Sequence, residues 1–339
     1  MKKSDFAKYL TSFFEYIRIE RGYSPKTICS YSTAFKLFLE FLSKEDGIKA
    51  DYIMLKDVNR KNVSRFLNWL QAERNSSDRT RNQRFAALSS FAHFMQYEDV
   101  ANLEQWNDIL TIHVKKTVQE SVLHMTPKAV KLLLESIPAN TPTGLRDLAM
   151  LSLLYESAAR VQELIDLTPR CLMLTNPCKV KLHGKGNKTR MVNLNECVKI
   201  LRLYMERTGL DLQANELRPL FCNNRQTKMS NAGIAYVIQR YIAPLQGKYP
   251  GVFPDNVTPH TFRHSRAMHL VANGVNLIYI RDILGHTSIK TTEHYARADS
   301  KQKNEAIENA YKISIPEPDD VPSWEKDQEL IEWLKSLGK

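Results

Sequence analysis

Apolar residues recur every three or four positions through the first 110 residues, which is the spacing of helices that bury one face. Ser24 and Pro25 add a helix cap and a first-turn proline to one of these stretches. The pattern predicts a bundle of four to five helices over residues 1–113. The core stripes are Phe6, Leu10, Phe13, Phe14 and Ile17, then Ile28, Tyr31, Phe35, Phe38 and Leu42, then Val63, Phe66, Leu67 and Leu70, then Phe85, Leu88, Phe91 and Met95.

The periodic pattern stops at residues 114–124, which are polar and predict a linker, and resumes in a second domain expected over 125–311. Residues 179–194 alternate as two short strands, joined by Gly184-Lys185-Gly186-Asn187-Lys188, a sequence typical of a hairpin turn. Helices are predicted over 143–157 and around 195–208, 230–243, 259–273 and 276–284. The expected fold class is therefore mainly α, with a helical bundle followed by a mixed α+β domain that holds a small β-hairpin or sheet.

Residues 312–339 are expected to form a tail. Three prolines and three acidic residues between Pro316 and Pro322 disfavour a continued helix there. A last amphipathic helix follows, and its apolar stripe is too small to fold alone, so it needs a groove to cover it. The stripe comprises Leu330, Ile331, Trp333, Leu334 and Leu337.

The basic residues are unevenly distributed along the chain. Residues 1–113 hold 17 basic and 14 acidic residues, 114–310 hold 27 and 16, and 311–339 hold 4 and 7, for a net charge of +11. The excess in the second domain favours a polyanionic partner, because side chains that neutralise phosphates release condensed counterions. Charge alone leaves DNA, RNA and an anionic membrane open.

Other features disfavour membrane, disulfide and metal roles. No stretch approaches the roughly 20 apolar residues that span a bilayer, and the start of the chain lacks a signal-peptide core. The five cysteines are scattered without a C-x-x-C pair, and no phosphate-binding loop or metal-ligand motif occurs. We expect a soluble cytoplasmic protein with no metal and no membrane partner.

The first candidate for chemistry is the segment that starts at Thr258. Thr258 is a good N-cap and Pro259 a good first helical residue, so His260 and Arg263 lie in the first turn and face the same way. A helix N-terminus already favours an anion, and an imidazole and a guanidinium would make it a phosphate site. A capped surface helix with an incidental pair is the alternative.

Tyr295 is the candidate nucleophile. Gly285 predicts a left-handed helix end before His286, and Ser288 can start a helix that carries Tyr295, nine residues after His286. A tyrosine on a helix is ordinarily a packing residue. Its candidacy therefore depends on the other motifs.

Two further motifs supply basic groups. Arg160 follows the small residues that end an apolar helix, and Glu163 can hold its guanidinium, although an exposed ion pair is the simpler alternative. Lys185 lies between two glycines at the hairpin tip and is followed by Lys188 and Arg190. Such a tip is either a solvated basic turn or a mobile ammonium that enters a groove.

In chain order these motifs resemble those of the tyrosine recombinase (phage integrase) family, especially the Xer-like recombinases and the integrases of mobile elements. The resemblance covers residues 125–310 and extends loosely to the N-terminal bundle, which is similar to the family's core-binding, SAM-like domain. Each motif is common alone, but five in this order identify the family. They are Arg160-x-x-Glu163, Gly184-Lys185-Gly186-Asn187-Lys188, His260-x-x-Arg263, Gly285-His286 and Tyr295.

The resemblance implies DNA cleavage through a covalent 3′-phosphotyrosine, without ATP or a metal. A tyrosine with a pKa near 10 needs a base and cationic surroundings to attack at neutral pH. The implied roles are nucleophile for Tyr295, phosphate clamp for Arg160 and Arg263, general base for His260, general acid for Lys185, phosphate support and tyrosine positioning for His286, and a supporting role for Glu163.

Basic residues elsewhere are candidates for DNA contacts. Those on the second and fourth helices of the bundle form either a solvated face or a face that grips phosphates. Where the family commonly has glycine this chain has Ala158 and Ala159, and Arg266 replaces an apolar aromatic, so Arg266 is expected to contact DNA. The predicted DNA-binding residues are Lys26, Arg79, Arg81, Arg84, Lys188, Arg190 and Arg266.

The resemblance also implies the partners. It implies double-stranded DNA with a site of inverted repeats, bound by a homotetramer on two duplexes, with accessory factors left open. The terminal helix packs either on a neighbouring subunit or back on its own domain. Integration, excision or transposition of a mobile element in a bacterial nucleoid is the expected task. The alternatives are chromosome dimer resolution, a type IB topoisomerase-like activity and a noncatalytic DNA-binding protein.

Overall fold

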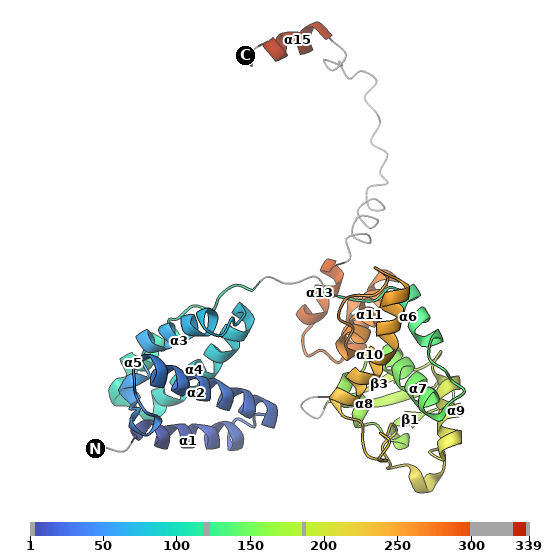
Figure 1. The fold of residues 1–339 in the computed structure, drawn as a ribbon, viewed down its shortest axis with the longest axis horizontal. Coiled ribbons are helices and arrows are strands. Elements are labelled where there is room, and N and C mark those ends of the chain that lie inside the picture. The colour runs from blue at the N-terminus through green and yellow to red at the C-terminus, as the bar shows by residue number, and fades with distance from the viewer. Residues whose placement is uncertain (1–3, 118–122, 185–187, 299–327, 337–339) are drawn as a thin grey trace. The chain divides into compact units, whose positions relative to one another are not determined.

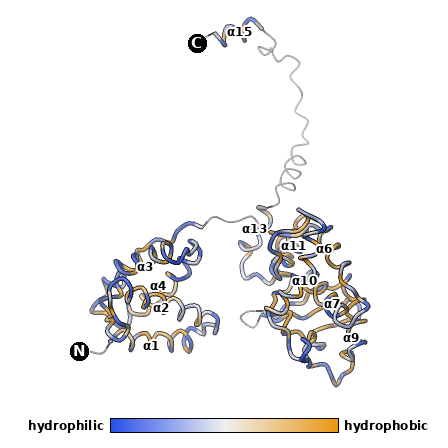
Figure 2. Tube along the Cα trace, viewed as in Figure 1, coloured by the Kyte–Doolittle hydropathy of each residue, from blue (hydrophilic) through white to orange (hydrophobic). Residues whose placement is uncertain are grey.

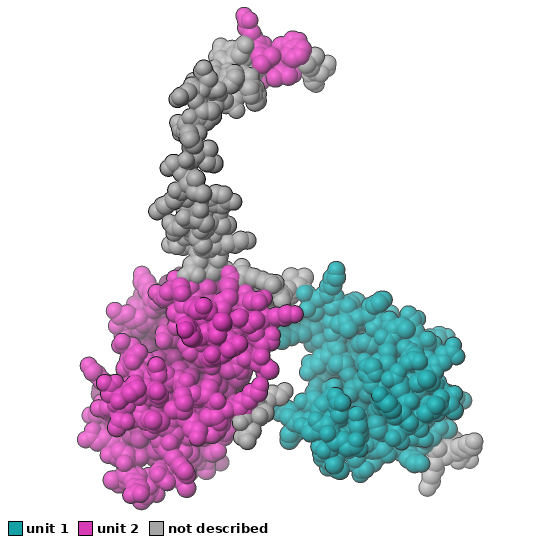
Figure 3. All heavy atoms as spheres, turned by 180° about the vertical axis from the view of Figure 1, so that it is seen from behind, with its two compact units in different colours: residues 1–120 teal, residues 121–339 magenta. Residues whose placement is uncertain are grey.

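The computed structural model describes residues 4–117, 123–184, 188–298 and 328–336. Internal contacts divide the chain into two compact units, 1–120 and 121–339, which Figure 3 colours separately. The predicted fold class is confirmed, because helices dominate both units and a small antiparallel sheet lies in the second (Figure 1).

The described part of unit 1 is a helical bundle with short 3-10 turns. Four of its helices start at a side-chain cap: Ser4, Ser24, Asn59 and Ser77 each accept a hydrogen bond from the backbone N–H three positions on. Each such cap stabilises its helix by about 1 kcal/mol. The helices are α1 (Asp5–Ile19), α2 (Pro25–Glu45), α3 (Arg60–Ala72), α4 (Asp78–Glu98) and α5 (Leu103–Leu110), with 3-10 turns at Ala50–Tyr52, Leu55–Asp57 and Val100–Asn102.

The core of unit 1 is rich in aromatic rings, as the stripes predict. Phe13 and Phe91 meet edge to face with ring centroids 5.4 Å apart, and Phe38 and Phe66 do so at 5.3 Å. Such pairs add about 0.5–1.5 kcal/mol to the stabilisation from burial. Figure 2 shows apolar and polar positions interspersed along these helices, and buried apolar side chains from all five helices form the core.

Helix α7 is mostly buried inside unit 2, where it contacts both α9 and α11. The helices are α6 (Pro127–Glu135), α7 (Pro142–Ser157), α8 (Val161–Ile165), α9 (Val198–Thr208), α10 (Asn231–Lys248), α11 (Pro259–Ala272), α12 (Leu277–Leu284) and α13 (Lys290–Ala298), with 3-10 turns at Pro169–Cys171 and Gln213–Asn215. The helices predicted around 195–208, 230–243, 259–273 and 276–284 correspond to α9 to α12, with shifts of a few residues at their ends.

The sheet of unit 2 has the antiparallel order β1-β2-β3 (Leu172–Met173, Lys179–His183, Thr189–Asn193). β2 and β3 are the predicted hairpin, and Val180 pairs with Val192 in their register. Val180 and Leu182 point into the core while their neighbours face outward, so the alternation of the sequence matches the pleat. The tip at residues 185–187 lies outside the described residues.

Helix α11 is fixed to the first residues of unit 2 by polar contacts inside the core. Ser265 Oγ accepts a hydrogen bond from Met125 N at 2.8 Å, and His269 Nε2 lies 2.8 Å from Met125 O, a carbonyl that only accepts. Nε2 therefore carries the hydrogen, and Nδ1 accepts from the Tyr155 hydroxyl at 2.8 Å. These bonds fix the orientation of the helix that bears His260 and Arg263.

The predicted terminal helix is present as α15 (Gln328–Ser336). Trp333 and Leu334 are 56% and 47% exposed, so two members of the apolar stripe are not covered by the described residues. Leu337 and the proline-rich stretch lie outside the described residues.

Candidate active site

The start of α11 has the predicted cap. Thr258 Oγ1 accepts a hydrogen bond from Thr261 N, and Pro259 occupies the first turn. His260 and Arg263 therefore both project from this end of the helix. Arg263 is buried at 4% exposure, whereas His260 is exposed.

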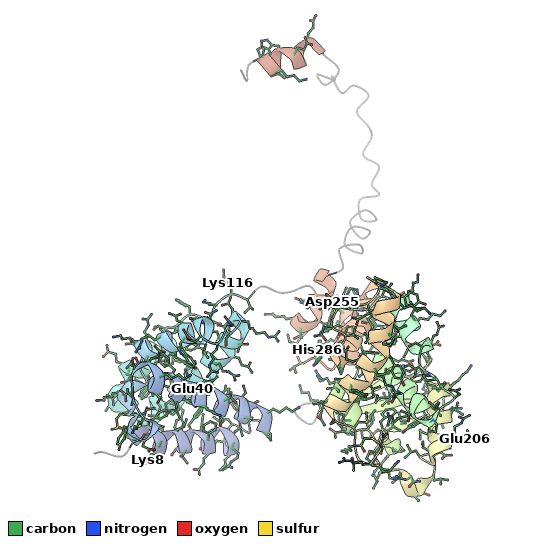
Figure 4. All side chains as sticks on the ribbon, in the orientation of Figure 1. Lys8, Glu40, Lys116, Glu206, Asp255 and His286 are labelled. Atoms are coloured by element: carbon green, nitrogen blue, oxygen red, sulfur yellow. The ribbon has the colours of Figure 1, made fainter. Side chains whose placement is uncertain are left out.

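The other end of the site is the last turn of α12. Gly285 has φ +61°, the left-handed conformation expected of a glycine that ends a helix, and His286 follows it (Figure 4). Three arginines donate to successive carbonyl oxygens there: Arg190 Nε to Ile283 O at 2.7 Å, Arg263 Nη2 to Leu284 O, and Arg160 Nη2 to Gly285 O at 3.1 Å. The carbonyls that a helix end leaves unpaired are thus bound by guanidinium groups.

Glu163 links two of these arginines. Its Oε1 accepts from Arg160 Nη1 at 2.8 Å and from Arg190 Nη1 at 2.9 Å, and its Oε2 accepts from Arg160 N at 2.8 Å and from Arg190 Nη2 at 2.7 Å. Burial alone would raise the pKa of the Glu163 carboxyl, but the bonds from Arg190 and Arg160 lower it below its usual value. The simpler interpretation as an exposed pair is wrong, because the Glu163 side chain is 3% exposed.

Arg263 completes a cluster of three guanidinium groups around one carboxylate. Its Nη1 donates to Ala158 O at 2.7 Å, and Ala158 itself ends α7 in the left-handed conformation. Burial, followed by the charges of Arg160 and Arg190, lowers the pKa of Arg263 to about 10, so Arg263 remains cationic at neutral pH. The cluster has an excess of positive charge that suits an anion such as a phosphate.

Tyr295 on α13 lies next to this cluster. It is 3% exposed, its ring stacks on His286 with centroids 6.4 Å apart, and its hydroxyl lies 2.7 Å from His264 Nδ1. Burial raises the pKa of Tyr295, and the charges of Arg263 and Arg160 partly oppose that rise. The phenol is therefore protonated at rest and hydrogen-bonded to an imidazole.

Two imidazoles next to Tyr295 are neutral at pH 7. Burial, followed by nearby charges, lowers the pKa of His264 and of His286 to about 4. His286 Nδ1 lies 3.0 Å from Thr292 Oγ1, a second contact between the end of α12 and α13. Both rings can accept a proton or a hydrogen bond.

His264 is a residue that the sequence analysis gave no role. Its ring lies 6.2 Å from that of His260 and 5.6 Å from that of Tyr295, between centroids. The signal was present, because positions four apart share a helix face, so His264 belongs to the same side of α11 as His260. The structure thus brings together Arg160, Glu163, His260, Arg263, His286 and Tyr295, and adds His264.

Lys185, the predicted general acid, lies outside the described residues. The base of its hairpin is described: Gly184 N donates to Lys188 O at 2.8 Å. Lys188 is exposed there, as are Lys26 and Arg79 in unit 1. These three side chains remain predicted DNA contacts.

Four of the predicted DNA-binding residues have partners inside the protein. Arg81 is 7% exposed and donates to Asn82, because position 81 faces the core side of α4. Arg84 Nη1 donates to Ser30 O at 3.2 Å, and the Arg266 guanidinium lies 5.5 Å from the centre of the Tyr155 ring. Arg190 is held by Glu163 and Ile283. The partners of Arg84, Arg190 and Arg266 are distant in the sequence, whereas Arg81 bonds to the next residue.

The described residues contain neither a cluster of metal ligands nor a membrane-spanning helix. No three His, Cys, Asp or Glu side chains gather there in a way that could hold a metal ion. Across the same residues, every helix is too short or too polar to cross a membrane.

Comparisons with known proteins agree with this geometry. The family described as phage integrase matches residues 123–302, more than half of the chain, and the phage integrase N-terminal SAM-like domain matches residues 10–99. The tyrosine recombinase XerC of Pelobacter propionicus is 28% identical over 314 residues, covering 92% of this chain and 98% of its own. XerC of Bacillus licheniformis is 31% identical over 291 residues, covering 85% and 90%.

Solved structures share the fold. The Tn1549 transposon integrase in complex with transposon right end DNA superposes with a TM-score of 0.69 at 16% identity, covering 89% of this chain and 99% of its own. The XerH site-specific recombinase bound to palindromic difH substrate gives a TM-score of 0.65 at 21% identity, covering 85% and 80%. The resemblance seen in the motifs is confirmed, and the chain belongs to the phage integrase family of tyrosine recombinases.

Proposed function

We propose that this tyrosine recombinase cuts and rejoins DNA at specific sites by attacking a DNA phosphate with the hydroxyl of Tyr295. The observation that carries the proposal is the position of that phenol, which lies between two neutral imidazoles and next to a buried cluster with excess positive charge. A packing tyrosine needs neither neighbour. A nucleophile needs both.

In the proposed step, the Tyr295 oxygen forms a bond to phosphorus and the bond from phosphorus to the 5′ oxygen breaks. Arg160 and Arg263 bind the non-bridging oxygens, where their charge stabilises the pentavalent transition state. Each uses two side-chain N–H groups on protein partners in the structure, out of the five that a guanidinium offers. The remaining donors are available to a phosphate.

The proposed proton transfers involve Tyr295, an imidazole and Lys185. The phenol proton passes to an imidazole, and Lys185 supplies a proton to the departing 5′ oxygen. By resemblance His260 is the base, while the 2.7 Å contact with Tyr295 supports His264 as a second acceptor. The phosphotyrosine ester retains the energy of the phosphodiester, so the reverse reaction rejoins a strand without ATP or a metal.

The proposed substrate is double-stranded DNA with inverted repeats, bound by a homotetramer that holds two duplexes. The DNA complexes of XerH and the Tn1549 integrase support a DNA partner. The exposed Trp333 and Leu334 of α15 support a helix exchanged between subunits. A bacterial nucleoid is the proposed location, and accessory factors are compatible with this assembly.

Integration, excision or transposition of a mobile element is the proposed task, by analogy with the Tn1549 integrase. Chromosome dimer resolution is the second candidate, because the relatives named XerC cover most of the chain. A type IB topoisomerase-like activity would relax DNA as a monomer. Pairing of two duplexes by the enzyme would therefore argue against it.

The test is a covalent trap. Binding sites are selected from a pool of randomised duplexes and rebuilt with a nick, so that the released strand diffuses away and religation fails. We expect an adduct at Tyr295, identified by peptide mass spectrometry, in EDTA and without ATP. An adduct that persists in Tyr295→Phe, or a selected site that yields none, would contradict the proposal.

A further inference from the structure

Arg190 joins three segments that are distant in the sequence. From β3 its two terminal nitrogens hold both oxygens of Glu163, at 2.9 and 2.7 Å, and its Nε donates to Ile283 O at 2.7 Å. This is the fork-to-fork geometry in which a guanidinium restrains a carboxylate most strongly. The Arg190 side chain is 11% exposed, and every one of its nitrogens has a protein partner.

The same two carboxylate oxygens direct Arg160. Glu163 Oε2 accepts from the Arg160 backbone N–H and Oε1 from the Arg160 guanidinium. Without Arg190, Glu163 would lose two of its four hydrogen bonds and the largest effect that holds its pKa down. The carboxylate that orients Arg160 would then be less firmly held.

Two glycines leave the space that this arrangement needs. A Cβ atom at Gly285 would lie 3.0 Å from Arg190 Nη1, and one at Gly184 would lie 3.1 Å from Glu163 Oε1. The base of the β2–β3 hairpin and the end of α12 therefore close directly on the arginine–carboxylate pair. Arg190 connects the hairpin that carries Lys185 with the helix end that precedes His286.

From this geometry we infer that Arg190 is a positioning residue for strand cleavage, which holds Arg160 at the reacting phosphate by way of Glu163. The inference rests on the proposed function. It replaces the expectation that Arg190 contacts DNA, since each nitrogen of its guanidinium donates to a protein partner. It also differs from general stabilisation, because the partner it orients belongs to the catalytic cluster.

The experiment compares Arg190→Gln and Arg190→Lys with a matched control, Arg146→Gln. Arg146 is also a largely buried arginine on a carboxylate, Asp147, with a bond to a backbone carbonyl, Cys222 O, but it shares no partner with Arg190. Three quantities are measured on the full chain: the single-turnover rate of adduct formation, the Kd for an intact duplex of the same site, and the Tm.

We expect Arg190→Gln to slow adduct formation by about 100-fold while the Kd changes by less than about 3-fold. Arg190→Lys should lie between it and the wild type, because an ammonium keeps the charge without the fork. Arg146→Gln should lower the Tm, with its rate within about 3-fold of wild type when measured below that Tm. If Arg190→Gln is too unstable to assay, Arg190→Lys carries the comparison.

A double variant separates positioning from structure. If Arg190 acts by way of Arg160, adding Arg190→Gln to Arg160→Lys should cost much less than it costs the wild type, because coupled residues are not additive. Full additivity, a Kd that weakens as much as the rate, or an equal rate loss in Arg146→Gln would overturn the inference. A wild type that forms no adduct would instead overturn the proposed function.

Discussion

The two units use their arginines in opposite ways. In unit 1, Arg81 and Arg84 each contact a neighbour on the same or an adjacent helix, around a core of aromatic rings. In unit 2, arginines from three segments converge on one helix end, and two of them also bind Glu163. The two arginines on one helix, Arg81 and Arg84, therefore have separate partners. Arg160, Arg190 and Arg263 are far apart in the sequence but meet in one charged cluster. Convergence on a shared partner, rather than local density of charge, marks the functional cluster.

The largest expected contrast comes from matched arginine substitutions in the two units. Arg263→Lys should slow adduct formation by about 1000-fold, because an ammonium cannot replace the guanidinium on Ala158, Leu284 and the phosphate together. Arg84→Lys should change that rate by less than about 3-fold. Single-turnover trapping measures the rate of adduct formation of both variants. Similar losses of rate in the two would contradict the proposed difference between the units.

A smaller effect is expected within unit 2 from the two histidines of α11. His264→Asn should slow adduct formation by about 30-fold, since it removes the ring that contacts the Tyr295 hydroxyl. His260→Asn is the comparison, because His260, one helical turn away, is the base that the resemblance implies. Rates measured from pH 5 to 9 distinguish a proton acceptor from a packing residue, because only the former changes the pH profile. A greater loss of rate in His260→Asn would indicate that His260, and not His264, is the principal proton acceptor.

The smallest predicted effect is on stability in acid. His264 and His286 have a pKa of about 4 in the fold and about 6.5 when unfolded, so the unfolded chain binds more protons between these values. Each of the two imidazoles should therefore cost unit 2 on the order of 2 kcal/mol of stability as the pH falls from 6.5 to 4.5. Circular dichroism follows the whole chain. In a Trp324→Phe, Trp333→Phe background the only tryptophans left are Trp69 and Trp106, so the fluorescence reports on unit 1. A double His264→Gln, His286→Gln variant should lose this dependence.

The sequence predicted the helices well because their periodicity is local. The stripes that include Phe13, Phe38 and Phe91 form the core of unit 1, and the alternation over 179–194 forms β2 and β3. The two-residue strand β1 could not be predicted, since two residues hold no period. The burial of Arg81 was also not predicted, because an arginine in a sequence is ordinarily taken for a surface residue.

The candidate site was predictable only as a set of residue types. The motifs named Arg160, Arg263, His286 and Tyr295, but side-chain partners depend on segments that meet only in the fold. Arg160 binds Gly285, 125 positions away, and Arg190 binds Ile283, 93 positions away. These pairings are the basis on which we infer a positioning role for Arg190 by way of Glu163.

The last turn of α12 has a consequence for how the site holds together over time. The amides of Gly285 and His286 are bonded to Asp282 O and Arg281 O, within the turn whose carbonyls receive the three arginines. One local opening of this turn would release all three guanidiniums at once. The candidate active site should thus behave as a single cooperative unit in hydrogen exchange, and the exchange of these two amides would report how often the site opens.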